Sequence, residues 1–282
     1  MEFDDFPLSP NRAVKADSYL EAYLEAQKTL KAGTNPKNVE QTRDLLALTN
    51  QIYAKSQSGT PLLRAHGSAP SDNVSAWISK LRTIAHWTVI SGIPKPFRGI
   101  EPEFAKEIPS TSRTVEGIRS LEKTLLSRGI ILIHQPAAPG SKVDGCAMKL
   151  ETGHMVVGMS LRHSRLDYYY FTLMHEIGHI TLHSNELDVP IVDDLDATDE
   201  ENGSEIEVEA NRFARDMLIP RNEWRTALAR TSLKRDDIVA FAERIGIAPQ
   251  IVAGRIRNER KRHDLFADII HEINVREILG DA

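Results

Sequence analysis

The chain of 282 residues is poor in cysteine, with a single one at Cys146. One cysteine can form no intramolecular disulfide and cannot build a cysteine-rich zinc site. The sequence also lacks any run approaching the roughly 18 apolar residues that a membrane-spanning helix needs. Its first ten residues are acidic and lack the apolar core of a secretory signal. We therefore expect a cytoplasmic protein with no membrane segment.

An excess of positive charge is missing as well. The 35 lysines and arginines against 40 aspartates and glutamates give a net charge of −5, so direct nucleic-acid binding is not expected. With 41% hydrophobic and 27% charged residues, the composition is typical of a soluble globular protein. The length is sufficient for one or two domains with a sizeable core.

Negative charge is concentrated between Glu186 and Glu209, which span eleven acidic residues and no lysine or arginine. The acidic density, Pro190 and Gly203 predict an exposed loop here. A loop of this charge could attract a basic protein substrate. The alternative is a solvated loop without a partner.

Apolar periodicity separates two regions. Residues 1–112 are expected to be mostly helical, with helices over 11–31, from about residue 38, and over 74–85. Four prolines and two glycines between residues 91 and 113 predict a connector.

Residues 113–282 mix helical periodicity with short β-branched runs, which predicts an α+β domain. Gly153 lies in the turn of an expected hairpin. The expected elements are a helix over 115–128, a strand over 130–133, hairpin strands over 146–150 and 155–161, helices over 166–183 and 204–218, and short helices to the end.

Residues 175–179 read His-Glu-Ile-Gly-His. Two histidines at positions i and i+4 lie on one helix face, about 6 Å apart along the axis, so their imidazoles can share one ion. Glu176 could take a proton from a zinc-bound water and pass it to a leaving amine. The pattern is the HExxH motif of zinc peptidases. Incidental histidines on a solvated helix are the alternative.

A zinc ion needs a third protein ligand. His183 lies about 12 Å along the helix from His175, which is too far, and the metzincin spacing would require a histidine where Asn185 stands. The next helix opens with three glutamates, of which only one can point at the metal. These are Glu205, Glu207 and Glu209. Asn211 stands four residues after Glu207 and could support a metal-binding helix face there.

The two helices together resemble the ImmA/IrrE family of metallopeptidases. In that family an HExxH helix is followed by a helix of the form E-x-x-A-[ND]-x-F-A, then an aliphatic pair and proline. The matching segment here reads Glu207-Val-Glu-Ala-Asn-Arg-Phe-Ala-Arg-Asp-Met-Leu-Ile-Pro220. The resemblance covers residues 113–260. It implies one zinc ion per chain with His175, His179 and Glu207 as ligands and Glu176 as general base.

The resemblance also implies a zincin-like domain in which an edge strand of a small sheet lines the cleft and pairs with the substrate peptide. We expect residues 155–161 to form that edge. A hydrolase also needs a group that stabilises the tetrahedral oxyanion. The candidates are His154, Arg162 and one tyrosine of the 168–170 run, such as Tyr170, with core packing as the alternative for each tyrosine.

Members of the family are described as cytoplasmic endopeptidases that cleave a helix-turn-helix repressor or antitoxin in a stress, mobile-element or phage-related switch. Residues 1–112 would then recognise the substrate or a regulator. The alternative is a toxin, antitoxin or repressor-type binding module whose zinc site is structural or vestigial. Residues 237–257, with Gly246 in a turn, could be mistaken for a DNA-reading helix-turn-helix, but the resemblance assigns them to the peptidase domain.

Overall fold

The computed structural model describes residues 72–136, 141–193 and 204–280, together with residues 23, 24, 26, 45, 46, 49, 64 and 65. The chain divides into two compact units, of which one comprises residues 1–62 and 70–84 and the other residues 63–69 and 85–282. Most of the helices expected over 11–31 and from residue 38 lie outside the described residues. A domain boundary at residue 112 stays a prediction.

A mixed sheet of five strands, in the order β1-β5-β3-β4-β2, lies in the second unit. β3 and β4 form the expected antiparallel hairpin, with Gly153 at a φ of 82° in its turn, and β2 runs parallel to β4. The strands are β1 Arg64–Ala65, β2 Ile130–His134, β3 Gly145–Lys149, β4 Met155–Met159 and β5 Ile191–Asp193. Together with the helices, this sheet confirms the predicted α+β class.

Two expectations about the sheet are wrong. The strand expected at the edge over residues 155–161 is an interior strand, because β4 pairs with β2 on one side and β3 on the other. All five β4 residues are buried, as both faces of an interior strand can be. The acidic stretch is not an exposed loop throughout, since β5 is buried and pairs with β3. Its two apolar residues, Ile191 and Val192, explain the burial.

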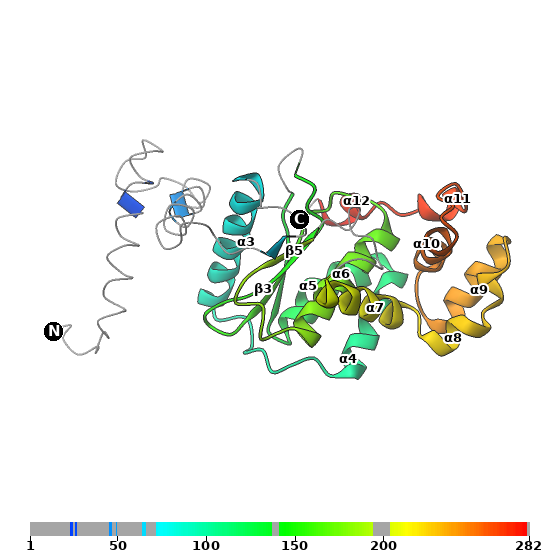
Figure 1. Ribbon diagram of the computed structural model, residues 1–282, viewed down its shortest axis with the longest axis horizontal. Helices are drawn as coiled ribbons and strands as arrows, with labels where there is room; N and C mark the ends of the chain where they lie inside the picture. Colours follow the sequence, from blue (N-terminus) through cyan, green and yellow to red (C-terminus); the bar gives the residue numbers. More distant parts are fainter. Residues whose placement is uncertain are drawn as a thin grey trace. The chain divides into compact units, whose positions relative to one another are not determined.

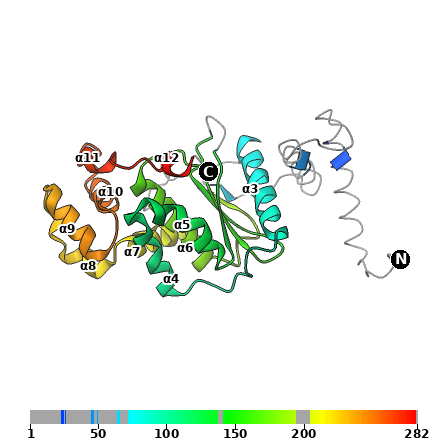
Figure 2. The same cartoon turned by 180° about the vertical axis from the view of Figure 1, so that it is seen from behind.

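Helices α5, α6 and α7 lie on one face of the sheet, as both views show (Figures 1 and 2). α5 (Val115–Leu126) begins where the Thr114 hydroxyl accepts a hydrogen bond from the Gly117 N–H. α6 (Leu166–Leu182) and α7 (Glu205–Leu218) confirm the two helices expected there. α6 is the central element, and its Leu173, Met174 and Ile177 are fully buried.

The remaining helices correct one further expectation. The segment expected as a connector over 91–113 contains two helices, each with a proline in its first turn, where the missing N–H costs no hydrogen bond. Phe104 and Ile108 there are buried in the core. These and the other helices are α3 Asp72–Ile90, α4 Pro102–Glu107, η1 Ile108–Arg113, α8 Arg221–Thr226, η2 Leu228–Arg230, α9 Arg235–Ile245, α10 Pro249–Arg260, α11 Ala267–Ile270 and α12 Val275–Leu279.

Across the described residues, every helix is too short or too polar to cross a bilayer.

Candidate metal centre

The helical spacing of the HExxH motif brings its two histidines together as expected. His175 and His179 are fully buried on α6, and their Nε2 atoms lie 3.0 Å apart. At this separation both ring nitrogens can contact one common ion. The motif therefore faces the protein interior and not solvent.

α7 adds the carboxylate of Glu207. Its oxygens lie 3.1 Å from His175 Nε2 and 3.5 Å from His179 Nε2. α7 can approach α6 this closely because residue 178 is glycine, where a Cβ would stand only 3.2 Å from the Ala210 Cα. The structure thus brings Glu207 to the two histidines, out of the three glutamates that open α7.

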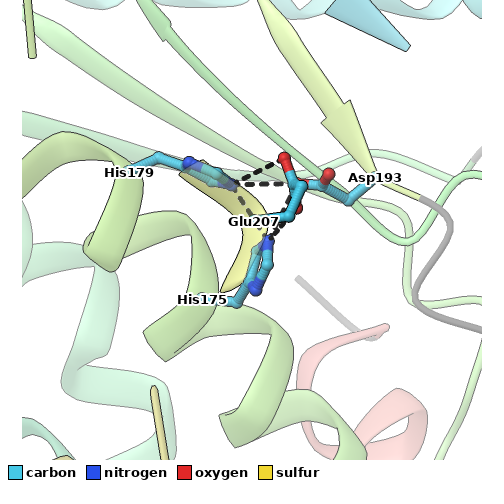
Figure 3. A group of neighbouring side chains, drawn as sticks. All are labelled: His175, His179, Asp193 and Glu207. Atoms are coloured by element: carbon cyan, nitrogen blue, oxygen red, sulfur yellow. Dashed lines mark hydrogen bonds and ion pairs between the residues drawn. The ribbon is translucent and has the colours of Figure 1, made fainter. Parts of the chain in front are cut away.

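β5 adds a second carboxylate, which sequence analysis missed. An oxygen of Asp193 lies 3.3 Å from His175 Nε2 and 3.6 Å from His179 Nε2, and the residue is 1% exposed. Figure 3 shows the four side chains pointing toward a common centre from α6, α7 and β5. The one local signal is the apolar pair Ile191-Val192 immediately before an aspartate in the acidic stretch.

The spacing of this cluster of His175, His179, Asp193 and Glu207 fits a tetrahedral metal ion. One ligand atom from each residue lies within 4.8 Å of all the others. Ligands about 2.0–2.2 Å from a tetrahedral ion are about 3.3–3.6 Å from one another. Three of the five histidine-centred contacts, at 3.3, 3.5 and 3.6 Å, match those edges, and the other two, at 3.0 and 3.1 Å, are slightly shorter. Both Asp193 carboxylate oxygens lack a hydrogen-bond donor among the described residues, as expected for atoms that a cation satisfies.

The histidines and the carboxylates of the cluster stabilise each other's charged forms. Burial by itself would lower the pKa of His175 and of His179, but the neighbouring Asp193 and Glu207 hold both above the usual range. Burial would likewise raise the pKa of Asp193 and of Glu207, but the two histidines hold both below the usual range. The carboxylates are therefore ionised and ready to bind a cation.

Glu176 lies beside the cluster and has the opposite character. Burial, and then the charge of Asp193, raises its pKa well above the usual range. Neither of its carboxyl oxygens has a hydrogen-bond partner in the part of the chain that the structure describes. A Cβ on Gly145 in β3 would collide with this carboxyl group, so the glycine leaves the space that Glu176 occupies.

Asn211 supports the cluster from the next turn of α7. Its Oδ1 lies 3.0 Å from His175 Nδ1 and accepts a hydrogen bond when Nδ1 carries the proton. That tautomer leaves the His175 Nε2 lone pair facing the centre of the cluster. Sequence analysis expected Asn211 to support the metal-binding face because it follows Glu207 by four residues. In the structure its contact in the cluster is with His175.

The three expected oxyanion-stabilising residues have partners elsewhere. His154 lies in the turn between β3 and β4 and contacts Thr152. This turn follows the last residue of β3, whereas Gly145 is the first. The Tyr170 hydroxyl is hydrogen-bonded to Thr111 of η1 at 2.7 Å. Arg162 donates two hydrogen bonds, of 2.8 and 2.7 Å, to Asp144. Among the three, only Arg162 is connected to the cluster, since the Asp144 N–H donates to the Asp193 carbonyl.

Other charged residues, in the acidic stretch and in the segment 237–257, lie outside the cluster. His183 contacts Glu209 at 2.9 Å, and Glu205 is exposed at the start of α7. On α10, Arg255 stacks on Trp224 and donates to the Arg215 and Ile219 carbonyls, and Arg257 is buried.

Comparison with known protein families matches residues 125–257 to the IrrE N-terminal-like domain of the M78 peptidases. No curated protein matches the chain. The matched residues include α6, β5 and α7, and so all four side chains of the cluster. Residues 125–257 therefore form an IrrE N-terminal-like domain of the M78 metallopeptidase family.

Proposed function

We propose that this protein is a zinc-dependent endopeptidase of restricted specificity. The observation that carries the proposal is the buried group of His175, His179 and Glu207 beside the uncompensated carboxyl of Glu176, in an M78 domain. Imidazole nitrogens with a carboxylate in a compact tetrahedral group are a ligand set that zinc accepts in peptidases. We therefore propose one zinc ion per chain, held by these three ligands.

When bound, the zinc ion would polarise the scissile carbonyl and lower the pKa of a coordinated water toward about 7. Glu176 would accept a proton from the attacking water and return it to the leaving nitrogen. The burial that raises its pKa makes it a stronger base than an exposed glutamate. Asn211 would keep the His175 ring in its metal-binding tautomer.

The proposed substrate is a regulatory protein of the cytoplasm, such as a helix-turn-helix repressor or an antitoxin, cut in a stress, mobile-element or phage-related response. The acidic stretch supports a basic partner of this kind. Between Glu186 and Glu209 it carries eleven acidic residues, of which Asp193 and Glu207 belong to the buried cluster, and no lysine or arginine. Such a field raises the encounter rate with a positively charged DNA-binding protein.

The test is an inventory of protein N-termini in cells that express the wild type or Glu176→Gln, with and without DNA damage or phage infection. A terminus found only with the wild type would name both the substrate and the bond. Glu205→Gln, an exposed glutamate of α7, is the matched control and should cut like the wild type. Equal inventories from all three proteins, each folded and metal-loaded, would contradict the peptidase.

A second candidate function is a toxin, antitoxin or repressor-type binding module with a structural metal site. One observation favours it, because Asp193 completes a set of four protein ligands. Structural zinc sites are closed by four protein ligands, whereas catalytic sites keep one position for water or substrate. The binding module predicts that Glu176→Gln leaves the cellular function unchanged.

A further inference from the structure

Asp193 occupies the position that a catalytic centre must leave open. Its carboxylate lies 3.3 and 3.6 Å from the two histidine Nε2 atoms, next to Glu207 in the same buried cluster. A metal ion that binds all four residues has no position for the attacking water. The four-ligand geometry therefore fits an inactive state of the metal centre better than an active one.

The strand that carries Asp193 also lies where a substrate strand would pair. β3 passes next to the general base, since the missing Cβ of Gly145 leaves room for the Glu176 carboxyl group. One side of β3 pairs with β4, and the other side pairs with β5, with Asp193 directly opposite Gly145. An extended peptide that binds by strand addition at this point of β3 would need the place that β5 holds.

We propose that β5 is an intramolecular inhibitory segment: Asp193 closes the metal centre as a fourth ligand, and β5 covers the strand edge of β3 that the substrate needs. The inference rests on the peptidase function proposed above. It explains both the four-ligand cluster and a buried strand in an otherwise acidic stretch. Activation then consists of the departure of β5, which opens the ligand position and the strand edge together.

The contacts of β5 are suited to a displaceable segment. It has three residues, which pair with three residues of β3 and with the two residues of β1. The ladder to β3 is antiparallel, so an incoming peptide in the same direction could replace it residue by residue. β3 keeps its pairing with β4 and β4 its pairing with β2 when β5 leaves, so of the other strands only the two-residue β1 loses its partner.

A cobalt readout tests the fourth ligand without any substrate. The full chain is loaded with Co²⁺, and its visible absorption is titrated with acetohydroxamate, a small ligand that needs an open coordination position. Asp193→Ala should bind acetohydroxamate at least 10-fold more tightly than the wild type and keep its cobalt through gel filtration. Asp188→Ala is the matched control, since Asp188 is an exposed carboxylate on the same segment that pairs with Lys149. Equal acetohydroxamate binding, or loss of cobalt from Asp193→Ala, would overturn the proposal.

A disulfide lock tests the strand. Cys146 is the single cysteine of the chain, and it lies directly opposite Val192 of β5. Opposed residues of an antiparallel pair have Cα atoms about 4.5–5.5 Å apart, within the range of about 4.4–6.8 Å that a disulfide accepts. Val192→Cys should therefore form one disulfide that pins β5 to β3.

The oxidised Val192→Cys protein, which keeps Asp193, should bind acetohydroxamate more weakly than the same protein reduced with dithiothreitol, because the disulfide holds Asp193 at the metal centre. Equal binding by the oxidised and the reduced protein would show that β5 need not leave, and would refute the strand part of the proposal. These readouts are independent of proteolysis. If Asp193→Ala opens the cobalt site while the N-terminus inventory stays unchanged, the peptidase fails and the fourth ligand stands. If the inventory contains N-termini that are found with the wild type and not with Glu176→Gln, while Asp193→Ala binds acetohydroxamate like the wild type, the peptidase stands and only the inhibitory role of β5 is refuted.

Discussion

Glu176 and the carboxylates of the neighbouring cluster differ in how their charges are stabilised, although all of them are buried in one site. The carboxylates of Asp193 and Glu207 are stabilised by two histidines, whereas Glu176 is buried without a hydrogen-bond partner among the described residues. A side chain in such a position lowers the stability of the folded state and is retained for its chemistry. This difference can be measured in the metal-free protein.

We predict that Glu176→Gln stabilises the metal-free protein at neutral and alkaline pH. Because the folded-state pKa of Glu176 is raised, its favourable contribution is complete below the ordinary value of 4.5 and is lost as pH rises through the raised pKa. Removing about 1 kcal/mol of this cost should raise the midpoint of thermal unfolding by about 2–4 °C at pH 8, with no difference near pH 4.5. Glu103→Gln, at an exposed glutamate of α4, should show no such trend. A lower midpoint for Glu176→Gln at pH 8 would contradict the buried charge.

Asn211 gives a second prediction at this scale. Asn211→Ala removes the group that accepts from His175 Nδ1, so the ring loses its preferred tautomer. Zinc affinity, measured by competition with a chromophoric chelator, should fall by about 10–100-fold. Asn222→Ala, at an exposed asparagine of α8, should leave affinity unchanged. An unchanged affinity for Asn211→Ala would mean that the contact does not orient the ligand.

At the scale of elements, the site depends on how closely α6 and α7 pack. The two helices meet at Gly178, where a Cβ would contact Ala210 at 3.2 Å and the Phe213 ring at 3.2 Å. Glu207 stands one turn before Ala210 on α7, so its distance to the histidines is set by this crossing. Gly178, the fourth residue of the HExxH motif, thus has a packing role.

We predict that Gly178→Ala moves α7 away by a few tenths of an ångström and weakens zinc binding by about 10-fold, within the range known for supporting residues of metal sites. Helix propensity works in the opposite direction, since alanine is favoured over glycine by about 1 kcal/mol. If Gly178→Ala gains thermal stability without metal yet loses zinc affinity, the weaker zinc binding is therefore caused by the changed packing of α6 against α7. Thr181→Ala, on the same helix, is the control and should keep full affinity. Unchanged affinity in both variants would show that the helices can adjust.

For the whole molecule, a bound metal joins three elements that are distant in sequence. The ligands come from α6, β5 and α7, so an ion that binds only the folded chain stabilises their association. At a free zinc concentration 100 times the dissociation constant, the gain is about 2.7 kcal/mol. For a unit of about 200 residues, this corresponds to a rise of about 5–10 °C in the midpoint of thermal unfolding.

We predict that this rise grows with pH. The two histidines must lose protons to bind metal, and their folded-state pKa is raised. In the metal-free protein their stabilising contribution is complete below the ordinary pKa of 6.5 and is lost as pH rises through the raised pKa. Both effects widen the difference between the loaded and metal-free midpoints from pH 6 to pH 8. The double variant His175→Ala and His179→Ala should show no zinc-dependent rise at any pH, and a rise in that variant would place the metal elsewhere.

Local patterns determined much of this protein in advance. The i, i+4 spacing of His175 and His179, and the pattern that singles out Glu207 on the next helix, depend on helix geometry that a sequence encodes directly. The same holds for the hairpin of β3 and β4, whose turn needs the positive φ of Gly153. In such cases the residues that define the element are adjacent in the chain.

The pairing of the strands and the fourth member of the cluster depend on contacts between segments that are distant in the sequence. Apolar runs show that strands such as β4 are buried, but not whether they lie at an edge or in the interior of the sheet. β5 has three residues, too few for a period, and its charged neighbours predict a loop. Asp193 becomes a candidate ligand only because β5 pairs with β3 next to Glu176. Helical spacing along the chain thus predicted the helical half of the site, whereas pairing between distant segments placed the fourth side chain, since sequence periodicity carries no information on which partner a strand takes.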